Sequence, residues 1–125
     1  MATQTITNDT FAATVSDNAI VLLDFWASWC GPCRAFAPVF EESSTSHPDI
    51  VFGKVDTEAE PVLAAEFGIQ SIPTLMAFRE GIMVFSQPGA LPAETLEKVI
   101  EAVEELDMDD VRAQVAEHHA GDASA

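Results

Sequence analysis

The amino-acid sequence predicts one α/β domain in which helices cover both faces of a mixed β-sheet. Residues 21–27 are apolar at nearly every position, which is typical of a central strand covered on both faces. Segments with the periodicity of strands and of helices alternate along most of the chain. Further along, the strand-like segments 74–78 and 82–85 are separated by Arg79-Glu80-Gly81, the length of a hairpin loop. Parallel strands joined by helices, followed by an antiparallel hairpin, form a mixed sheet.

The first half of the chain predicts two helices among its strands. Polar residues at 7–9 can cap a short helix that begins at Phe11. Pro32 suits the first turn of a longer helix, because the N–H group that it lacks would have no helical partner there, and His47-Pro48 ends that helix. The elements expected in this half are the helix from Phe11, the strand 21–27, the helix 32–46 and the strand 50–55, with residues 3–6 as a further candidate strand.

The second half of the chain predicts a short helix, the hairpin and a final helix. Pro61 and Gly68 are typical of the two ends of a helix over 61–67. The final helix is indicated by one apolar stripe at helical spacing, formed by Leu96, Val99, Ile100, Val103 and Leu106. The predicted order of elements is therefore αβαβαββα, preceded by the candidate strand.

The length and composition agree with a single folded domain. The 125 residues are too few for two independent cores. A domain of this size buries roughly two-thirds of its unfolded surface, so it needs no metal ion or disulfide for stability. Hydrophobic residues make up 48% of the chain, which excludes a disordered protein.

The chain is strongly acidic. Asp and Glu number 21 against 5 Lys and Arg, which gives a net charge of −16 at pH 7. Such a surface repels phosphate backbones and anionic lipid heads, so we expect neither a nucleic-acid partner nor a membrane partner. Adaptation to high salt would produce the same charge balance, although an acidic C-terminal part already supplies much of the excess.

The sequence also predicts a cytoplasmic protein. The longest apolar run, residues 20–27, is interrupted by Asp24 and is too short to span a membrane. Residues 1–10 have neither a basic start nor an apolar stretch, unlike a signal peptide. Cys30 and Cys33 are the two cysteines of the chain, and in a reducing compartment such a pair is more often redox-active or metal-binding than structural.

These two cysteines flank Gly31-Pro32 at the point where the predicted central strand gives way to a helix. Open α/β sheets carry their functional sites at the carboxyl ends of strands. Cys30 would lie at the helix N-terminus, where free N–H groups and the helix dipole favour a thiolate. Cys33 is its neighbour on the helix surface and is within reach of a disulfide. The spacing therefore indicates a dithiol that can close and open.

The alternative interpretation of the cysteine pair is half of a zinc site. Zinc requires four ligands, or three protein ligands in a catalytic site. The chain has no further cysteine, and its three histidines, His47, His118 and His119, are not placed by the sequence to complete such a site. We therefore expect no metal, and we expect the histidines to be solvated.

Asp24 lies inside the apolar strand, six residues before Cys30. A buried carboxyl group is unfavourable unless it is paired or its pKa rises. The functional interpretation is a proton acceptor and donor beneath the dithiol, and the alternative is a solvent-facing position in the strand. Lys54, in the next strand, is the basic residue able to lie beside Asp24, although it is equally well explained as an exposed lysine.

The segment 24–34 (Asp-Phe-Trp-Ala-Ser-Trp-Cys-Gly-Pro-Cys-Arg) resembles the active-site segment of the thioredoxin family. Further segments match the family in order: Ala37-Pro38, Lys54-Val55-Asp56, Phe67-Gly68-Ile69, Ser71-Ile72-Pro73-Thr74 and Gly89-Ala90-Leu91. The resemblance covers residues 1–106 and implies the thioredoxin fold. Pro88 departs from the family, which commonly has a β-branched residue there.

The resemblance also implies a role for individual residues. Cys30 would be the attacking nucleophile and Cys33 the resolving thiol. Asp24 would be the buried acid and base that serves Cys33, with Lys54 as its electrostatic partner. Pro73 would follow a cis peptide bond and face the cysteines. An apolar patch that receives the backbone of a substrate would consist of Trp29, Gly31, Pro32, Ile72, Pro73, Gly89 and Ala90.

The implied function is that of a protein-disulfide reductase that carries electrons by dithiol–disulfide exchange. Its partners would be disulfide-containing client proteins and a thioredoxin reductase, a flavoprotein that draws on NADPH, and the chain itself would bind no cofactor and act as a monomer. An oxidant or isomerase is disfavoured by Gly31-Pro32, because more oxidising relatives carry polar or histidine-bearing dipeptides there. The alternative from another class is a redox-independent binding or chaperone module that uses the apolar patch.

Residues 107–125 form an acidic C-terminal extension beyond the usual end of the family's fold. Asp107 can cap a short helix that ends before Gly121. Met108, Val111 and Val115 form a narrow apolar stripe, so we expect this helix to form by docking on the body of the fold, followed by a disordered tail. A wholly disordered acidic tail is the alternative.

Overall fold

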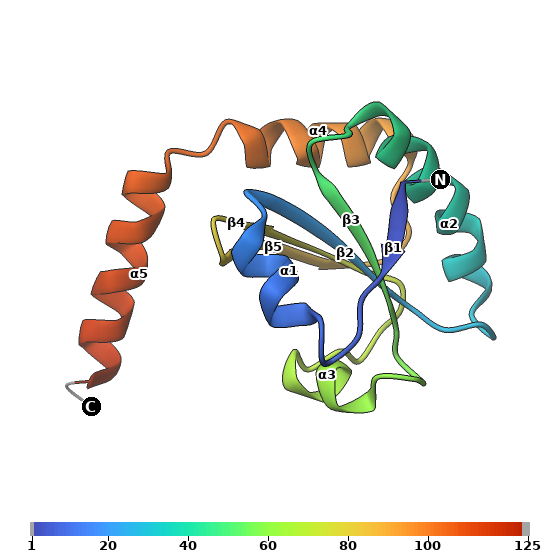
Figure 1. The fold of residues 1–125 in the computed structure, drawn as a ribbon, viewed down its shortest axis with the longest axis horizontal. Helices are drawn as coiled ribbons and strands as arrows, with labels where there is room; N and C mark the ends of the chain where they lie inside the picture. The colour runs from blue at the N-terminus through green and yellow to red at the C-terminus, as the bar shows by residue number, and fades with distance from the viewer. Residues whose placement is uncertain (1, 124–125) are drawn as a thin grey trace.

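Strands and helices alternate along the chain in a computed structural model, which describes the backbone of residues 2–123 and the side chains of residues 2–117 (Figure 1). The strands are β1 (Thr3–Thr5), β2 (Ile20–Trp26), β3 (Val51–Asp56), β4 (Thr74–Arg79) and β5 (Ile82–Pro88). The helices are α1 (Phe11–Asp17), α2 (Gly31–Ser46), α3 (Pro61–Glu66), α4 (Ala93–Glu104) and α5 (Met108–Ala123). Residues 3–6, the candidate strand of the sequence, contribute β1.

The strands form one sheet in the order β1-β3-β2-β4-β5. β1, β3 and β2 are parallel to one another, whereas β4 runs antiparallel to β2 and β5 antiparallel to β4. The predicted mixed sheet is therefore confirmed. β2 lies at its centre, which explains why its residues are apolar on both faces: residues 21–25 are all fully buried.

Two hydrophobic cores lie on opposite faces of the sheet. Leu22 belongs to the core beneath α2 and α4, and its neighbour Leu23 belongs to the core beneath α1 and α3, because successive side chains of a strand point to opposite faces. Phe36, Phe40 and Phe52 fill much of the first core. Helices therefore cover both faces, as the sequence predicts (Figure 1).

Gly53 allows close packing in the middle of the sheet. A Cβ atom at this position would lie 2.5 Å from Cγ1 of Ile6 and 2.8 Å from Cδ2 of Leu23. These separations are too short for any side chain, so the glycine lets two branched aliphatic residues meet over β3. The sequence pattern does not reveal this requirement, because it arises from Ile6, which directly follows β1 and is distant from Gly53 in the chain.

Most boundaries differ from the sequence prediction by a residue or two, and two boundaries differ further. β5 continues to Pro88 instead of ending at Phe85, because the strand lies at the edge of the sheet, where polar residues face solvent and a proline N–H is not needed. α5 continues through Gly121 to Ala123, so the expectation that Gly121 follows the helix is wrong. A glycine inside a helix is less favourable than alanine by only about 1 kcal/mol, which does not force the helix to end. The predicted disordered tail after α5 falls on residues 124–125, outside the described residues.

The extension is attached to the body by α4 and by the β4–β5 turn. The guanidinium of Arg79 donates to the carbonyl oxygens of Val103, Glu104 and Leu106 at 2.8–2.9 Å, which fixes the end of α4 and the linker after it. Arg112 on α5 forms ion pairs with Glu80 in the turn and with Asp109. Met108 is buried, and Val111 and Val115 are half-buried. In Figure 1, α5 stands apart from the other helices, on the side toward which the β4–β5 turn points.

Truncation after Leu106 is expected to lower the free energy of unfolding by about 1–2 kcal/mol, because it exposes the surface that Met108 covers. The disulfide-reductase activity that the resemblance implies should stay within about twofold of the full chain, since α5 contributes no thiol or base. Denaturant unfolding and a turnover assay of both chains measure the two quantities. Unchanged stability would show that α5 does not dock, and a large loss of turnover would show that it contributes to catalysis or client binding.

Candidate active site

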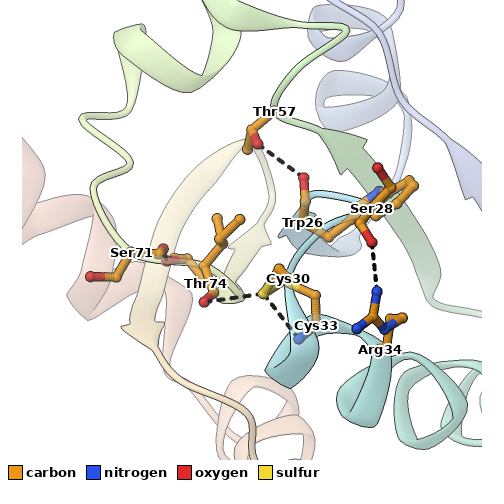
Figure 2. Close-up of a disulfide and its surroundings, with 9 residues drawn as sticks. Trp26, Ser28, Cys30, Cys33, Arg34, Thr57, Ser71 and Thr74 are labelled. Carbon is orange, nitrogen blue, oxygen red and sulfur yellow. Dashed lines mark hydrogen bonds between the residues drawn. A yellow bond between two sulfur atoms is a disulfide. The ribbon is translucent and has the colours of Figure 1, made fainter.

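Cys30 and Cys33 lie where β2 has ended and α2 begins (Figure 2). The two residues are joined by a disulfide, and their Cα atoms are 5.2 Å apart. Both side chains are nearly buried, with exposed fractions of 4% and 3%. The structure therefore places the cysteine pair at the strand-to-helix junction that the sequence predicts.

Cys30 is the N-cap residue of α2. The backbone N–H of Cys33 donates to Sγ of Cys30 at 3.1 Å, and the N–H of Arg34 donates to the Cys30 carbonyl oxygen at 3.2 Å. When the disulfide is open, the same N–H group and the positive end of the helix dipole stabilise negative charge on the Cys30 sulfur. Cys33 lies inside the first turn and has no equivalent position at the helix terminus.

The loop before β4 lies against Cys30. The Ile72–Pro73 peptide bond is cis, as the resemblance implied, and Sγ of Cys30 is 3.6 Å from the carbonyl oxygen of Ile72. The N–H of Gly89 donates to the Pro73 carbonyl oxygen at 2.7 Å, which brings the end of β5 to the same place. Gly89 has a φ of 103°, a conformation that strongly favours glycine.

The surface around the disulfide is exposed and partly apolar. The Trp29 side chain is 66% exposed, and Gly31, Pro32, Gly89 and Ala90 are also exposed, whereas Pro73 is buried and Ile72 half-buried. Trp29 and Ile72 share a groove of about 180 Å³, whose other lining residues are Thr57, Ile69 and Gln70. Sequence reasoning did not assign these three residues to the site, although Ile69 and Gln70 directly precede the Ser71-Ile72-Pro73-Thr74 segment.

Thr57 connects the loop after β3 to the end of β2. Its backbone N–H and its hydroxyl both donate to the Trp26 carbonyl oxygen, at 2.9 and 3.0 Å (Figure 2). On the other side of the junction, the Arg34 guanidinium donates to the Ser28 carbonyl oxygen at 3.0 Å. These contacts hold the segment between β2 and α2, and with it the cysteines, from both sides.

Asp24 is fully buried in β2, on the same face of the sheet as Leu22 and therefore on the side covered by α2. Neither carboxyl oxygen has a hydrogen-bond partner among the described residues. Burial raises the pKa of Asp24 from its ordinary value of 3.8 to about 7, and the positive charge of Lys54 opposes this rise. The solvent-facing alternative is thereby excluded, and the group can gain or lose a proton near neutral pH.

Lys54 is the register partner of Asp24 on β3, so both side chains emerge on one face. The lysine is half-buried, and within the described part of the chain it forms no ion pair with Asp24. Its Nζ instead lies 5.2 Å from the centre of the Trp26 ring, in cation–π geometry. Nε1 of Trp26 is buried without a hydrogen-bond partner among these residues.

Within residues 2–117, no cluster of three or more His, Cys, Asp or Glu side chains could hold a metal ion. His47 pairs instead with Glu97 of α4 at 2.7 Å. The side chains of His118 and His119 lie outside the described residues. No described helix combines the length and the apolar character that crossing a membrane requires.

A dithiol whose first sulfur caps a helix, set against a cis-proline loop at the end of a mixed sheet, defines a thiol–disulfide oxidoreductase. The Thioredoxin family model matches residues 2–102. The chain is 57% identical over 119 residues to a Streptomyces coelicolor protein assigned as thioredoxin 2, a match that covers 95% of this chain and 89% of the relative. It is 45% identical over 98 residues to thioredoxin 1 of Synechococcus elongatus, covering 77% of this chain and 92% of the relative.

Solved structures agree with these matches. A mutant thioredoxin from Halobacterium salinarum superposes with a TM-score of 0.76 at 34% identity, covering 82% of this chain and 90% of that chain. Plasmodium falciparum thioredoxin gives a TM-score of 0.74 at 34% identity, over 79% and 97% of the two chains. The chain belongs to the thioredoxin family, and its Cys30–Cys33 pair is the redox-active centre of this oxidoreductase.

Proposed function

We propose that the chain reduces disulfides of client proteins, with Cys30 as the attacking nucleophile. The observation that carries this proposal is the N–H group of Cys33 directed at Sγ of Cys30 at 3.1 Å, because it stabilises a thiolate on that sulfur. The Cys30 thiolate attacks one sulfur of the client disulfide. A bond forms between Cys30 and the client, and the second client sulfur leaves as a thiolate that takes up a proton.

Cys33 completes the exchange. Its thiol loses a proton, and the resulting thiolate attacks Sγ of Cys30. The mixed disulfide breaks, the remaining client sulfur leaves as a thiolate, and the Cys30–Cys33 disulfide forms. Two electrons pass from the chain to the client, which is reduced as the chain is oxidised.

Asp24 is proposed to accept the proton of Cys33 and to return it when the chain is reduced again. Its burial on the α2 side of the sheet and its pKa of about 7 support this role. Lys54 acts on the reaction through Asp24, because its positive charge favours the ionised carboxylate and so lowers the pKa of Asp24.

The client backbone is proposed to lie on the patch around the disulfide. The contact of Sγ of Cys30 with the Ile72 carbonyl oxygen and the Gly89–Pro73 hydrogen bond support this placement, since they gather these loops beside the sulfur. The proposed patch residues are Trp29, Gly31, Pro32, Ile72, Pro73, Gly89 and Ala90.

A thioredoxin reductase that draws on NADPH is proposed to reopen the Cys30–Cys33 disulfide, with the chain acting as a cytoplasmic monomer that binds no cofactor itself. A reducing compartment suits this cycle, because a dithiol must be kept open to reduce clients. Cell fractionation with an antibody to the chain tests the location.

Insulin reduction tests the proposed activity. With dithiothreitol as reductant, the chain is expected to accelerate the turbidity that follows when the insulin chains separate, at concentrations well below that of insulin. Catalytic acceleration would support disulfide exchange. A chain that leaves the rate unchanged would be a redox-independent binding module, and the proposed function would be wrong.

A further inference from the structure

A groove of about 470 Å³ lies between α5 and the beginning of β5, at a place that the dithiol chemistry does not use. Residues 82–84 of β5 line one side, and Val111 and Val115 of α5 line the other. Leu106 contributes from the linker between α4 and α5. The Met83 side chain is 49% exposed, so apolar surface remains open to solvent in this α5–β5 groove.

The groove reaches the free edge of the sheet where β5 begins. β5 pairs with β4 on one side and, among the described residues, with no strand on the other. Residues 82–84, the first three of this strand, line the groove, and the register with β4 shifts at Val84, where β5 carries a bulge. The unpaired N–H and C=O groups of such an edge can accept another strand.

The rim of the groove is acidic. Asp107 and Asp110 line it, and no lining residue is Lys, Arg or His. Arg112 is the cation nearest along α5, and its charge is already matched by Glu80 and Asp109. The carboxylates of Asp107 and Asp110 accept hydrogen bonds from uncharged groups of α5 but form no ion pair within the described part of the chain.

We propose that the α5–β5 groove binds an extended segment of a partner protein that alternates aliphatic with basic residues, and that this segment adds to β5 as a sixth strand. The aliphatic side chains would contact Val84, Val111 and Val115, and the basic side chains would face Asp107 and Asp110. A second copy of this chain does not fit this description, because each copy carries a net charge of −16.

The proposed docking site leaves the dithiol free. β5 begins at Ile82 beside the groove and ends at Pro88, next to the Gly89 that contacts Pro73. Its seven residues separate the two sites by about 20 Å at the rise of a β-strand. A partner held in the groove would therefore raise the effective concentration of its own disulfide near Cys30 without covering it.

The test uses the oxidised full chain and an acetylated, amidated seven-residue peptide that alternates lysine with valine. Backbone amide shifts of the ¹⁵N-labelled chain are expected to change saturably at residues 82–84 and 107–115. A peptide with the same sequence but N-methylated on alternate amides should bind at least about tenfold more weakly, because it lacks the strand's hydrogen-bond donors. No saturable change at 82–84, or equal affinity of the two peptides, would overturn the proposal.

A pair of variants separates this site from general attraction of a basic peptide to an acidic protein. Asp110→Lys is expected to weaken binding at least about fivefold, whereas Glu42→Lys, the same charge reversal on an exposed position of α2, should change affinity less than about twofold. Asp110→Asn replaces the first variant if the amide shifts show that α5 has unwound. Equal weakening by both charge reversals would overturn the proposal. Amide shifts at 82–84 that change with protein concentration in the absence of peptide would also overturn it. Neither readout depends on disulfide exchange.

Discussion

The Cys30→Ser variant is expected to lose at least about 100-fold of its insulin-reducing activity, because a serine hydroxyl does not ionise near neutral pH and cannot form a disulfide with the client. Sγ of Cys30 accepts a hydrogen bond from the backbone N–H of Cys33 at the start of α2. No other thiol in the chain has this environment, since Cys33 is the second of only two cysteines.

The control for this variant is Ser28→Ala, which changes an exposed residue of the same junction and should leave the rate within about twofold. Circular dichroism of both variants verifies that the fold is retained. Activity of Cys30→Ser comparable with the unmodified chain would contradict the assignment of Cys30 as the nucleophile.

The Asp24→Asn variant is expected to be more stable than the unmodified oxidised chain at pH 8 and to reduce clients at least about tenfold more slowly. The pKa of Asp24 is about 7 in the folded chain and 3.8 ordinarily, so the folded state holds its proton more tightly than the unfolded state. The stability of the unmodified chain therefore falls as the pH rises from about 4 to about 7, and a shift of this size corresponds to about 4 kcal/mol at most. Asparagine removes the loss of stability that comes from ionisation, although its buried amide group also lacks hydrogen-bond partners.

Urea unfolding at pH 5 and pH 8 measures this effect. Relative to the unmodified chain, the free energy of unfolding of Asp24→Asn should be about 1–3 kcal/mol more favourable at pH 8 than at pH 5. Asp49→Asn, the same substitution at an exposed position, is the matched control. The same difference at both pH values for Asp24→Asn would contradict the raised pKa.

The central elements of the fold could be predicted because their signals are local. The strand 21–27 is apolar on both faces, Pro32 and Pro61 suit the first turns of α2 and α3, and the glycine at 81 permits a tight turn. Helices on both faces then follow from short connections between parallel strands. The ends of the elements differ from the prediction by one to three residues, because polar residues such as those at the end of β5 can belong to an edge strand or a loop.

The cysteine pair could also be predicted, since the strand-to-helix junction and the spacing of Cys30 and Cys33 are both visible in the sequence. The burial of Asp24 follows from its apolar neighbours, but the distribution of charge around it does not. Lys54 lies over the Trp26 ring instead of forming an ion pair with Asp24, and this depends on side-chain packing between strands. The cis bond before Pro73 was implied only by the resemblance, because about one X–Pro bond in twenty is cis in folded proteins.

Other features depend on residues that are distant in the chain. Gly53 is required by the approach of Ile6 and Leu23, and Thr57 reaches Trp26 only because β3 lies beside β2. Glu80 adopts a positive φ of 52° in the β4–β5 turn, where its side chain pairs with Arg112 of α5. No local pattern predicts this ion pair, which helps to place the extension and with it the α5–β5 groove.

The most direct test of the central claim is to locate the mixed disulfide that forms when one cysteine is replaced. Reduced Cys33→Ser is mixed with insulin, the products are separated on a non-reducing gel, and the linked peptides are identified by mass spectrometry. We expect a stable adduct joined through Cys30 in this variant, because the resolving thiol is absent, and little or no adduct with Cys30→Ser. An adduct that forms through Cys33 in Cys30→Ser as fast as the one through Cys30 would contradict the proposed division of roles.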